Sequence, residues 1–67
     1  MQIRVNGQGR ECREGMTIGD LLSELNLAVD GVAVAVNDEV IPRTNHPIRI
    51  LLDRDSVEII HAVGGGA

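Results

Sequence analysis

The nine residues TIGDLLSEL, Thr17 to Leu25, decide how the rest of this 67-residue chain can fold. The stretch begins with a threonine followed three residues later by an acid, which is typical of a helix N-cap with favourable charge on the first turn. Its apolar residues fall at positions i, i+3, i+4 and i+7 and so line one stripe of a helix. We therefore predict a core helix of about two to three turns that ends near Asn26.

The chain before the helix has the pattern of a β-hairpin. Residues 2–6 alternate polar and apolar, and Asn6-Gly7 favours a turn because both residues tolerate positive φ. Residues 10–14 then return as a second strand, whose charged side chains are typical of a sheet edge. We interpret Cys12 in this strand as a small hydrophobe at an inward position rather than a nucleophile or redox thiol.

Further strands are predicted after the helix. Residues 32–36 are apolar on both alternating faces, as in an interior strand, and Val40-Ile41 forms a very short strand that Pro42 stops. Residues 43–47 are predicted to be a surface loop that exposes His46, and residues 48–52 a short apolar segment. After a turn at residues 53–55, the last strand places four residues on one face, Val57, Ile59, His61 and Val63.

This order of elements predicts an α+β fold. A hairpin, a helical crossover and a final strand that returns into the sheet are most economically packed as one helix across a mixed sheet of four to five strands. That is the β-grasp (ubiquitin-like) arrangement. We expect one domain over residues 1–63, followed by a flexible glycine-rich tail over residues 64–67.

Composition excludes several classes of function. The chain has no aromatic residue and a net charge of −4, so it lacks stacking platforms and repels phosphate, and we expect no nucleic-acid partner. All six basic residues are arginine, so no lysine is available for Schiff-base chemistry. The single cysteine excludes an internal disulfide, and no apolar run resembles a signal or membrane segment. We expect a cytoplasmic protein without a membrane partner.

Ordinary catalytic and metal-binding patterns are missing. Cys12, His46 and His61 match no ligand spacing, and the Asp53/Asp55 pair lacks the further oxygen ligands of a calcium loop. Residues 7–9 lack the third glycine and the flanking helix of a phosphate loop. We expect no catalytic side chain, no metal and no bound cofactor.

Four segments together resemble a known family. Over essentially its whole length the chain resembles the ThiS-type sulfur carrier proteins of thiamin biosynthesis, which are ubiquitin-like β-grasp proteins. The segments that carry the resemblance are residues 1–7, 17–25, 32–37 with 40–43, and 53–60, the last running into the glycines.

The resemblance implies a function for the tail formed by Val63, Gly64, Gly65 and Gly66. In the family, a ubiquitin-activating-type (ThiF-like) enzyme uses ATP to adenylate the terminal glycine, and a sulfur donor such as a cysteine desulfurase supplies the sulfur of a thiocarboxylate. A ThiG-like thiazole synthase then receives the sulfur. The carrier is a co-substrate, and glycine suits the site because a Cβ would crowd the carboxylate.

Two positions depart from the family pattern. Ala67 follows the Gly-Gly pair, so it is removed before activation, is tolerated, or marks a chain that does not carry sulfur; we favour removal, which would leave Gly66 as the activated residue. Arg54 stands where the family often has glycine, so its turn is expected to carry mild strain.

Two other functions stay open at this point. One is a sulfur carrier for another pathway, such as molybdopterin synthesis, and the other is a noncovalent β-grasp interaction module in which the tail is inert. In either carrier case, partner contacts are expected at the tail and at neighbouring exposed residues such as Ile60 and Arg43.

Overall fold

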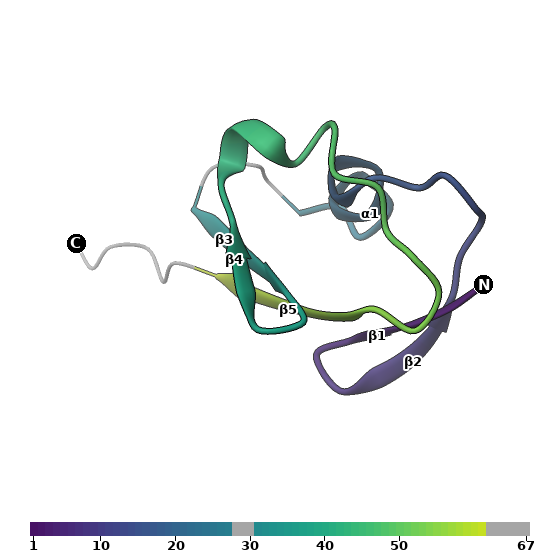
Figure 1. Ribbon diagram of the computed structural model, residues 1–67. Helices are drawn as coiled ribbons and strands as arrows, with labels where there is room; N and C mark the ends of the chain where they lie inside the picture. Colours follow the sequence, from purple (N-terminus) through teal and green to yellow (C-terminus); the bar gives the residue numbers. More distant parts are fainter. Residues whose placement is uncertain (28–30, 62–67) are drawn as a thin grey trace.

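The computed structural model describes residues 1–27 and 31–61. Within these ranges the chain forms five strands, one α-helix and one short 3₁₀ helix (Figure 1). In chain order they are β1 (Gln2–Val5), β2 (Gln8–Glu11), α1 (Ile18–Glu24), β3 (Val32–Val36), β4 (Glu39–Ile41), η1 (Arg43–Asn45) and β5 (Ser56–His61).

The strands form one mixed sheet in the order β2-β1-β5-β3-β4. The β1–β5 pair is parallel and the other three pairs are antiparallel. The helix α1 lies across one face of this sheet (Figure 1). The predicted β-grasp arrangement is confirmed, and it makes β5, the last strand along the chain, the central strand of the sheet.

The core lies between α1 and the sheet and is built from aliphatic side chains, as the absence of aromatic residues requires. Close packing of such side chains is the main stabilising term that a chain of this size has available. The residues that are essentially inaccessible to solvent are Ile3, Met16, Ile18, Leu21, Leu22, Val34, Val36, Leu51 and Val57. Every predicted inward position of the helix is therefore in the core except Leu25, which is half-buried.

The helix begins as the sequence predicts. Thr17 is the N-cap, and its side-chain oxygen accepts a hydrogen bond from the backbone N–H of Asp20, 3.1 Å away. The Asp20 carboxylate accepts in return from the backbone N–H of Thr17, also at 3.1 Å, which completes a capping box. At the other end Asn26 has a φ of 57°, the left-handed conformation that commonly follows a helix and that asparagine tolerates.

The second strand differs from its prediction over residues 10–14. The turn uses only Asn6 and Gly7, with φ values of 52° and 84°, so the chain reverses at once and β2 starts at Gln8. Cys12 consequently follows β2 instead of lying inside it. Its side chain is buried in the core, in agreement with its interpretation as a small hydrophobe.

The predicted surface loop over residues 43–47 is only partly correct. Residues Arg43–Asn45 form the 3₁₀ helix η1, and His46 directly after it is 2% exposed, so the expectation of a solvated His46 was wrong. The ring Nε2 lies 3.1 Å from the backbone oxygen of Ile41, to which it can only donate. The backbone of His46 approaches the first turn of α1, where its oxygen accepts from the N–H of Gly19 at 2.8 Å. This backbone bond holds His46 against the start of the helix.

The turn before β5 holds Arg54 in the left-handed region, with a φ of 71°. The expected strain at this position is confirmed, because a residue with a Cβ pays conformational energy at positive φ. Asp55 in the same turn is buried, and its carboxylate accepts hydrogen bonds from Asn37 Nδ2 at 3.0 Å and from the backbone N–H of Leu52 at 2.8 Å. The bond from Asn37 ties the start of β5 to the β3–β4 hairpin.

Candidate functional site

The predicted functional residues Val63, Gly64, Gly65 and Gly66, and Ala67 after them, lie outside the described residues. The structure describes the strand that leads to them. Strand β5 is hydrogen-bonded to β1 on one side and to β3 on the other, as far as the backbone pair Val32–His61. Strand β5 is thus paired with β1 near its start and with β3 from Val57 to His61.

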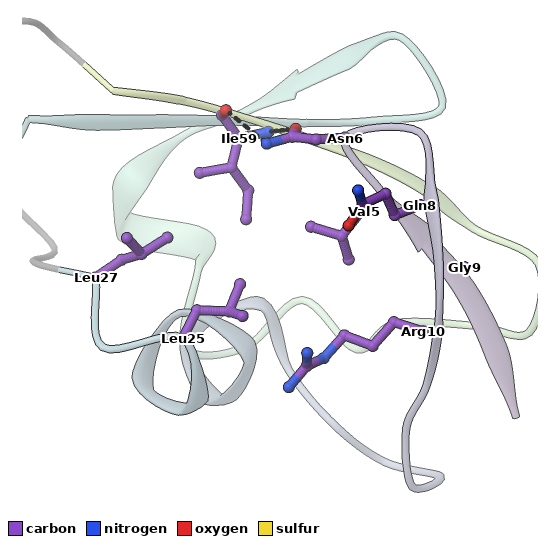
Figure 2. A pocket seen from close by; sticks show the side chains of 8 residues that line it. All are labelled: Val5, Asn6, Gln8, Gly9, Arg10, Leu25, Leu27 and Ile59. Carbon is purple, nitrogen blue, oxygen red and sulfur yellow. Dashed lines mark hydrogen bonds between the residues drawn. The ribbon is translucent and has the colours of Figure 1, made fainter.

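The side-chain amide of Asn6 extends the contact between β1 and β5. The backbone register of this parallel pair runs through Val5–Val57. One step further, Asn6 Oδ1 accepts from the backbone N–H of Ile59 at 2.8 Å, and Asn6 Nδ2 donates to the Ile59 oxygen at 3.4 Å (Figure 2). The amide thus bonds both backbone groups of Ile59, as a neighbouring strand would. Sequence analysis assigned Asn6 only to the turn and missed this second role.

The sheet face opposite α1 carries an exposed apolar surface next to the same strand. Ile60 is 59% exposed and faces Ala33 across the β3–β5 pair, while Val40 is 72% exposed and faces Ala35 across the β3–β4 pair. Partners in register point to one side of a sheet, so these four residues share the outer face. Exposed apolar surfaces of this kind are typical of protein contact sites. The prediction that Ile60 is exposed is confirmed; its role in partner contact stays a prediction, as does that of the exposed Arg43.

Few side chains in the described residues are suited to chemistry. Burial raises the pKa of the Cys12 thiol above its ordinary value, so at neutral pH it is a protonated thiol and a poor nucleophile. Among the side chains that the structure describes, no three His, Cys, Asp or Glu residues gather as a metal site. The side chain of His61, the third member of the weak Cys/His set, lies outside this description.

Charged side chains cluster instead on the exposed side of α1. Arg13 bridges two carboxylates, with Nη1 lying 3.4 Å from Glu24 and Nη2 lying 3.5 Å from Asp20. Arg10 on β2 places Nη2 3.2 Å from the same Glu24. The cluster pairs two cations with two anions and fastens the hairpin to the helix. Hydrogen bonds from Thr17, and then the charge of Arg13, hold the pKa of the Asp20 carboxyl below its usual value.

No helix within residues 1–27 and 31–61 has the length and apolar character needed to cross a membrane.

Comparison with families and curated proteins gives one consistent result. A family model described as the ThiS family matches residues 3–66. The sulfur carrier protein ThiS of Escherichia coli (strain K12) is 33% identical over 66 residues, which cover 98% of this chain and 100% of that protein. The sulfur carrier protein ThiS of Bacillus subtilis (strain 168) is 37% identical over 65 residues, which cover 96% of this chain and 98% of that protein.

A second kind of relative is longer. The thiazole synthase of Magnetococcus marinus is 35% identical over 66 residues, which are 98% of this chain but 20% of that protein. In that protein a segment similar to this chain forms part of a polypeptide about five times as long.

The fold is also found in solved structures. The crystal structure of the thiamine biosynthesis protein ThiS from Geobacter metallireducens matches with a TM-score of 0.85 and 33% sequence identity, covering 98% of this chain and 100% of that one.

Proposed function

This chain belongs to the ThiS family and is a sulfur carrier protein of thiamin biosynthesis, and from this premise we propose that the sulfur is carried on the carboxyl group of Gly66. The observation that supports this site most directly is the extent of the family match, which runs from residue 3 through Gly66 and stops before Ala67. The position of β5 adds to it, since the central strand of the sheet leads directly to the glycines.

The chemistry of the proposed site needs activation, because a free carboxylate is a poor electrophile. An adenylating enzyme of the ubiquitin-activating (ThiF-like) type joins the Gly66 carboxylate to AMP from ATP and releases pyrophosphate. The outer sulfur of a persulfide on a donor such as a cysteine desulfurase then displaces AMP and forms an acyl disulfide. A thiol reductant breaks the S–S bond of that disulfide, is itself oxidised to a disulfide, and leaves the thiocarboxylate. Glycine at positions 64, 65 and 66 leaves the carbonyl open to approach from either side, because no Cβ shields it.

The carrier itself supplies no catalytic side chain and no bound cofactor in this proposal. Its part is to present the carboxyl terminus on a narrow chain that can reach into a partner's active site. At about 3.3 Å for each extended residue, four residues reach roughly 13 Å. ATP is consumed at the adenylating enzyme. The proposed setting is the cytoplasm.

Thiazole synthase is the proposed acceptor of the sulfur. Relatives of this chain that bear that name contain a similar segment within the same polypeptide, which would keep carrier and acceptor together. The apolar outer face at Ala33, Ala35, Val40 and Ile60 is available for docking next to the strand that carries the tail.

Ala67 has to leave before Gly66 can be adenylated. Removal of one residue from a glycine-rich segment requires only that a protease reach the Gly66–Ala67 bond. A chain that ends at Gly66 is therefore proposed as the active form.

A growth assay tests this function against the two other candidates. A bacterial strain that lacks its own sulfur carrier requires added thiazole. Expression of this chain should let the strain grow without added thiazole, and expression of the Gly66→Val variant should not. A Gly66→Val variant that restores growth as well as the original chain would show that the carboxyl-terminal glycine carries no sulfur. Rescue of a molybdopterin requirement instead of the thiazole requirement would assign the carrier to that pathway.

A further inference from the structure

A pocket of about 340 Å³ opens between the β1–β2 hairpin and the end of α1 (Figure 2). It is lined by residues from four parts of the chain. Its apolar walls are Val5 on β1, Leu25 and Leu27 at the end of the helix, and Ile59 on β5. Gln8 and Arg10 of β2 contribute its polar side. The volume lies within the range of pockets that bind small groups, so it can accept an aliphatic side chain.

The pocket lies at the end of the sheet from which the tail leaves. Strands β1 and β5 are parallel, so the hairpin turn that follows Val5 is at the same end as His61. Ile59, one wall of the pocket, is only two residues before His61, and the Asn6 amide holds its backbone in place. A protein that takes up the tail must therefore come close to this pocket.

The charges beside the pocket show which kind of polar group it suits. Arg10 is already paired with Glu24 through Nη2, and the surrounding cluster has equal numbers of cations and anions. An anionic ligand would find no excess positive charge, on a chain with a net charge of −4. However, Arg10 Nε is buried and has no hydrogen-bond partner among the described residues, and a buried donor left unsatisfied is destabilising. A neutral acceptor such as a peptide carbonyl would relieve this cost.

Arg10 is able to turn towards such an acceptor. Its side chain is 37% exposed, and its one hydrogen bond within the described part of the chain is to Glu24 at the edge of the helix. The guanidinium group carries five donors, so a new bond does not require the Glu24 bond to break.

We propose that this pocket receives an aliphatic side chain of thiazole synthase, and that the backbone carbonyl of the same segment accepts a hydrogen bond from Arg10. The inference rests on the proposed function, because it takes thiazole synthase as a protein that receives the tail. The pocket is a second anchor, on the helix side of the sheet, distinct from the exposed apolar face. It would set the direction in which the tail enters the partner.

The direct test fills the pocket and measures binding of the full chain to thiazole synthase from the same organism. Gln8 is exposed on the pocket wall, so Gln8→Trp places an indole over the apolar residues with no loss from the core. The chain has no aromatic residue, so fluorescence of the free variant reports whether the indole is shielded from water. The dissociation constant should rise at least tenfold, with the melting temperature unchanged.

Two further variants and a control separate the parts of the pocket. Leu27→Ala removes one apolar wall and should weaken binding several-fold, and Arg10→Lys keeps the charge but loses the Nε donor and should do the same. Leu52→Ala is the matched control, because Leu52 is an exposed leucine just before the turn that starts β5, at the opposite end of the sheet. Its binding should equal that of the original chain.

The outcomes distinguish this inference from the proposed function. Unchanged binding of all three pocket variants to thiazole synthase would show that the pocket does not contact the synthase. If the same preparations still formed the thiocarboxylate, the proposed carrier function would be unaffected. Variants that bind the synthase normally but are poorly adenylated would overturn the choice of occupant. An original chain that neither binds the synthase nor accepts sulfur would overturn both.

Discussion

Asn6 holds Ile59 by both of its backbone groups, through bonds of 2.8 Å from the Ile59 N–H and 3.4 Å to the Ile59 oxygen. The same asparagine has a φ of 52° and is the first residue of the hairpin turn. One residue thus reverses the first hairpin and secures the strand that leads to the tail proposed to carry sulfur. Few residue types meet both requirements, since asparagine combines tolerance of the left-handed region with an amide that imitates a peptide group.

Replacing this amide should loosen the end of β5. Asn6→Ala removes both bonds and places a less tolerant residue at positive φ, so the free energy of unfolding should fall by about 2 kcal/mol. Asn6→Asp keeps the acceptor for the Ile59 N–H and should lose less. Hydrogen exchange of the Ile59 amide reports the effect locally. An exchange rate in Asn6→Ala equal to that of the original chain would contradict the role assigned to Asn6.

The capping carboxylate should make stability depend on pH in acid. The folded state lowers the pKa of Asp20 from its ordinary value of 3.8, chiefly through the hydrogen bonds from Thr17. Because folding lowers the pKa of Asp20, the ionised carboxylate adds stability to the folded state at pH values above the pKa of the unfolded chain. This stability is lost as the pH falls through the lower pKa of the folded protein. Asp20→Asn should therefore reduce stability at neutral pH and flatten the acid side of the curve. Denaturant unfolding between about pH 2 and pH 7 measures this difference. Parallel curves for the two proteins would rule the linkage out.

Cys12 should be unreactive and dispensable for sulfur transfer. Burial raises its pKa from 9.0, so the thiol in the folded protein should react with alkylating reagents roughly tenfold or more slowly than in urea. Because folding raises the pKa of Cys12, the stability that the protonated thiol contributes is fully present at pH values below the pKa of the unfolded chain. It is lost as the pH rises through the higher pKa of the folded protein. Cys12→Ala should cost about 1 kcal/mol of stability and still form the thiocarboxylate. Loss of conversion in a folded Cys12→Ala protein would mean that the thiol takes part in the chemistry.

Arg54 offers a simple route to a more stable domain. Its φ of 71° costs a residue with a Cβ about 1–2 kcal/mol. Glycine avoids this cost, but it loses more conformational entropy on folding, which offsets part of the gain. Arg54→Gly should therefore raise the free energy of unfolding by about 0.5–1 kcal/mol. Its side chain is 90% exposed, and its ion pair with Asp53 at 3.8 Å contributes little. Arg54→Ala keeps the Cβ and serves as the control that should show no gain.

The regular elements could be predicted because local patterns specify them. The alternation in residues 32–36 fixed β3 to the residue, and the capping pair Thr17/Asp20 fixed the start of α1. The family likewise follows from segments that keep their order along the chain. Strand β2 begins two residues earlier than predicted. A two-residue turn and a longer turn leave the same alternating pattern in the residues that follow, so the pattern does not distinguish them.

The tertiary features were not predictable in this way. Nothing local to His46 indicates that it is buried or that its backbone bonds the first turn of α1, because that bond joins residues 27 positions apart, Gly19 and His46. The pocket beside Arg10 likewise depends on how the hairpin, the helix end and β5 meet. An amide that bonds a strand 53 residues away, as Asn6 does, has the same sequence signature as an ordinary turn asparagine.

We expect above all that the carboxyl group of Gly66 becomes a thiocarboxylate. Intact mass spectrometry of the full chain, after incubation with an extract of its host, ATP and cysteine as the sulfur source, measures this directly. The expected result is the loss of one alanine residue and then the replacement of one oxygen atom by sulfur at the carboxyl terminus. A mass that stays unchanged, in an extract that converts a known sulfur carrier under the same conditions, would contradict it and would favour a noncovalent interaction module.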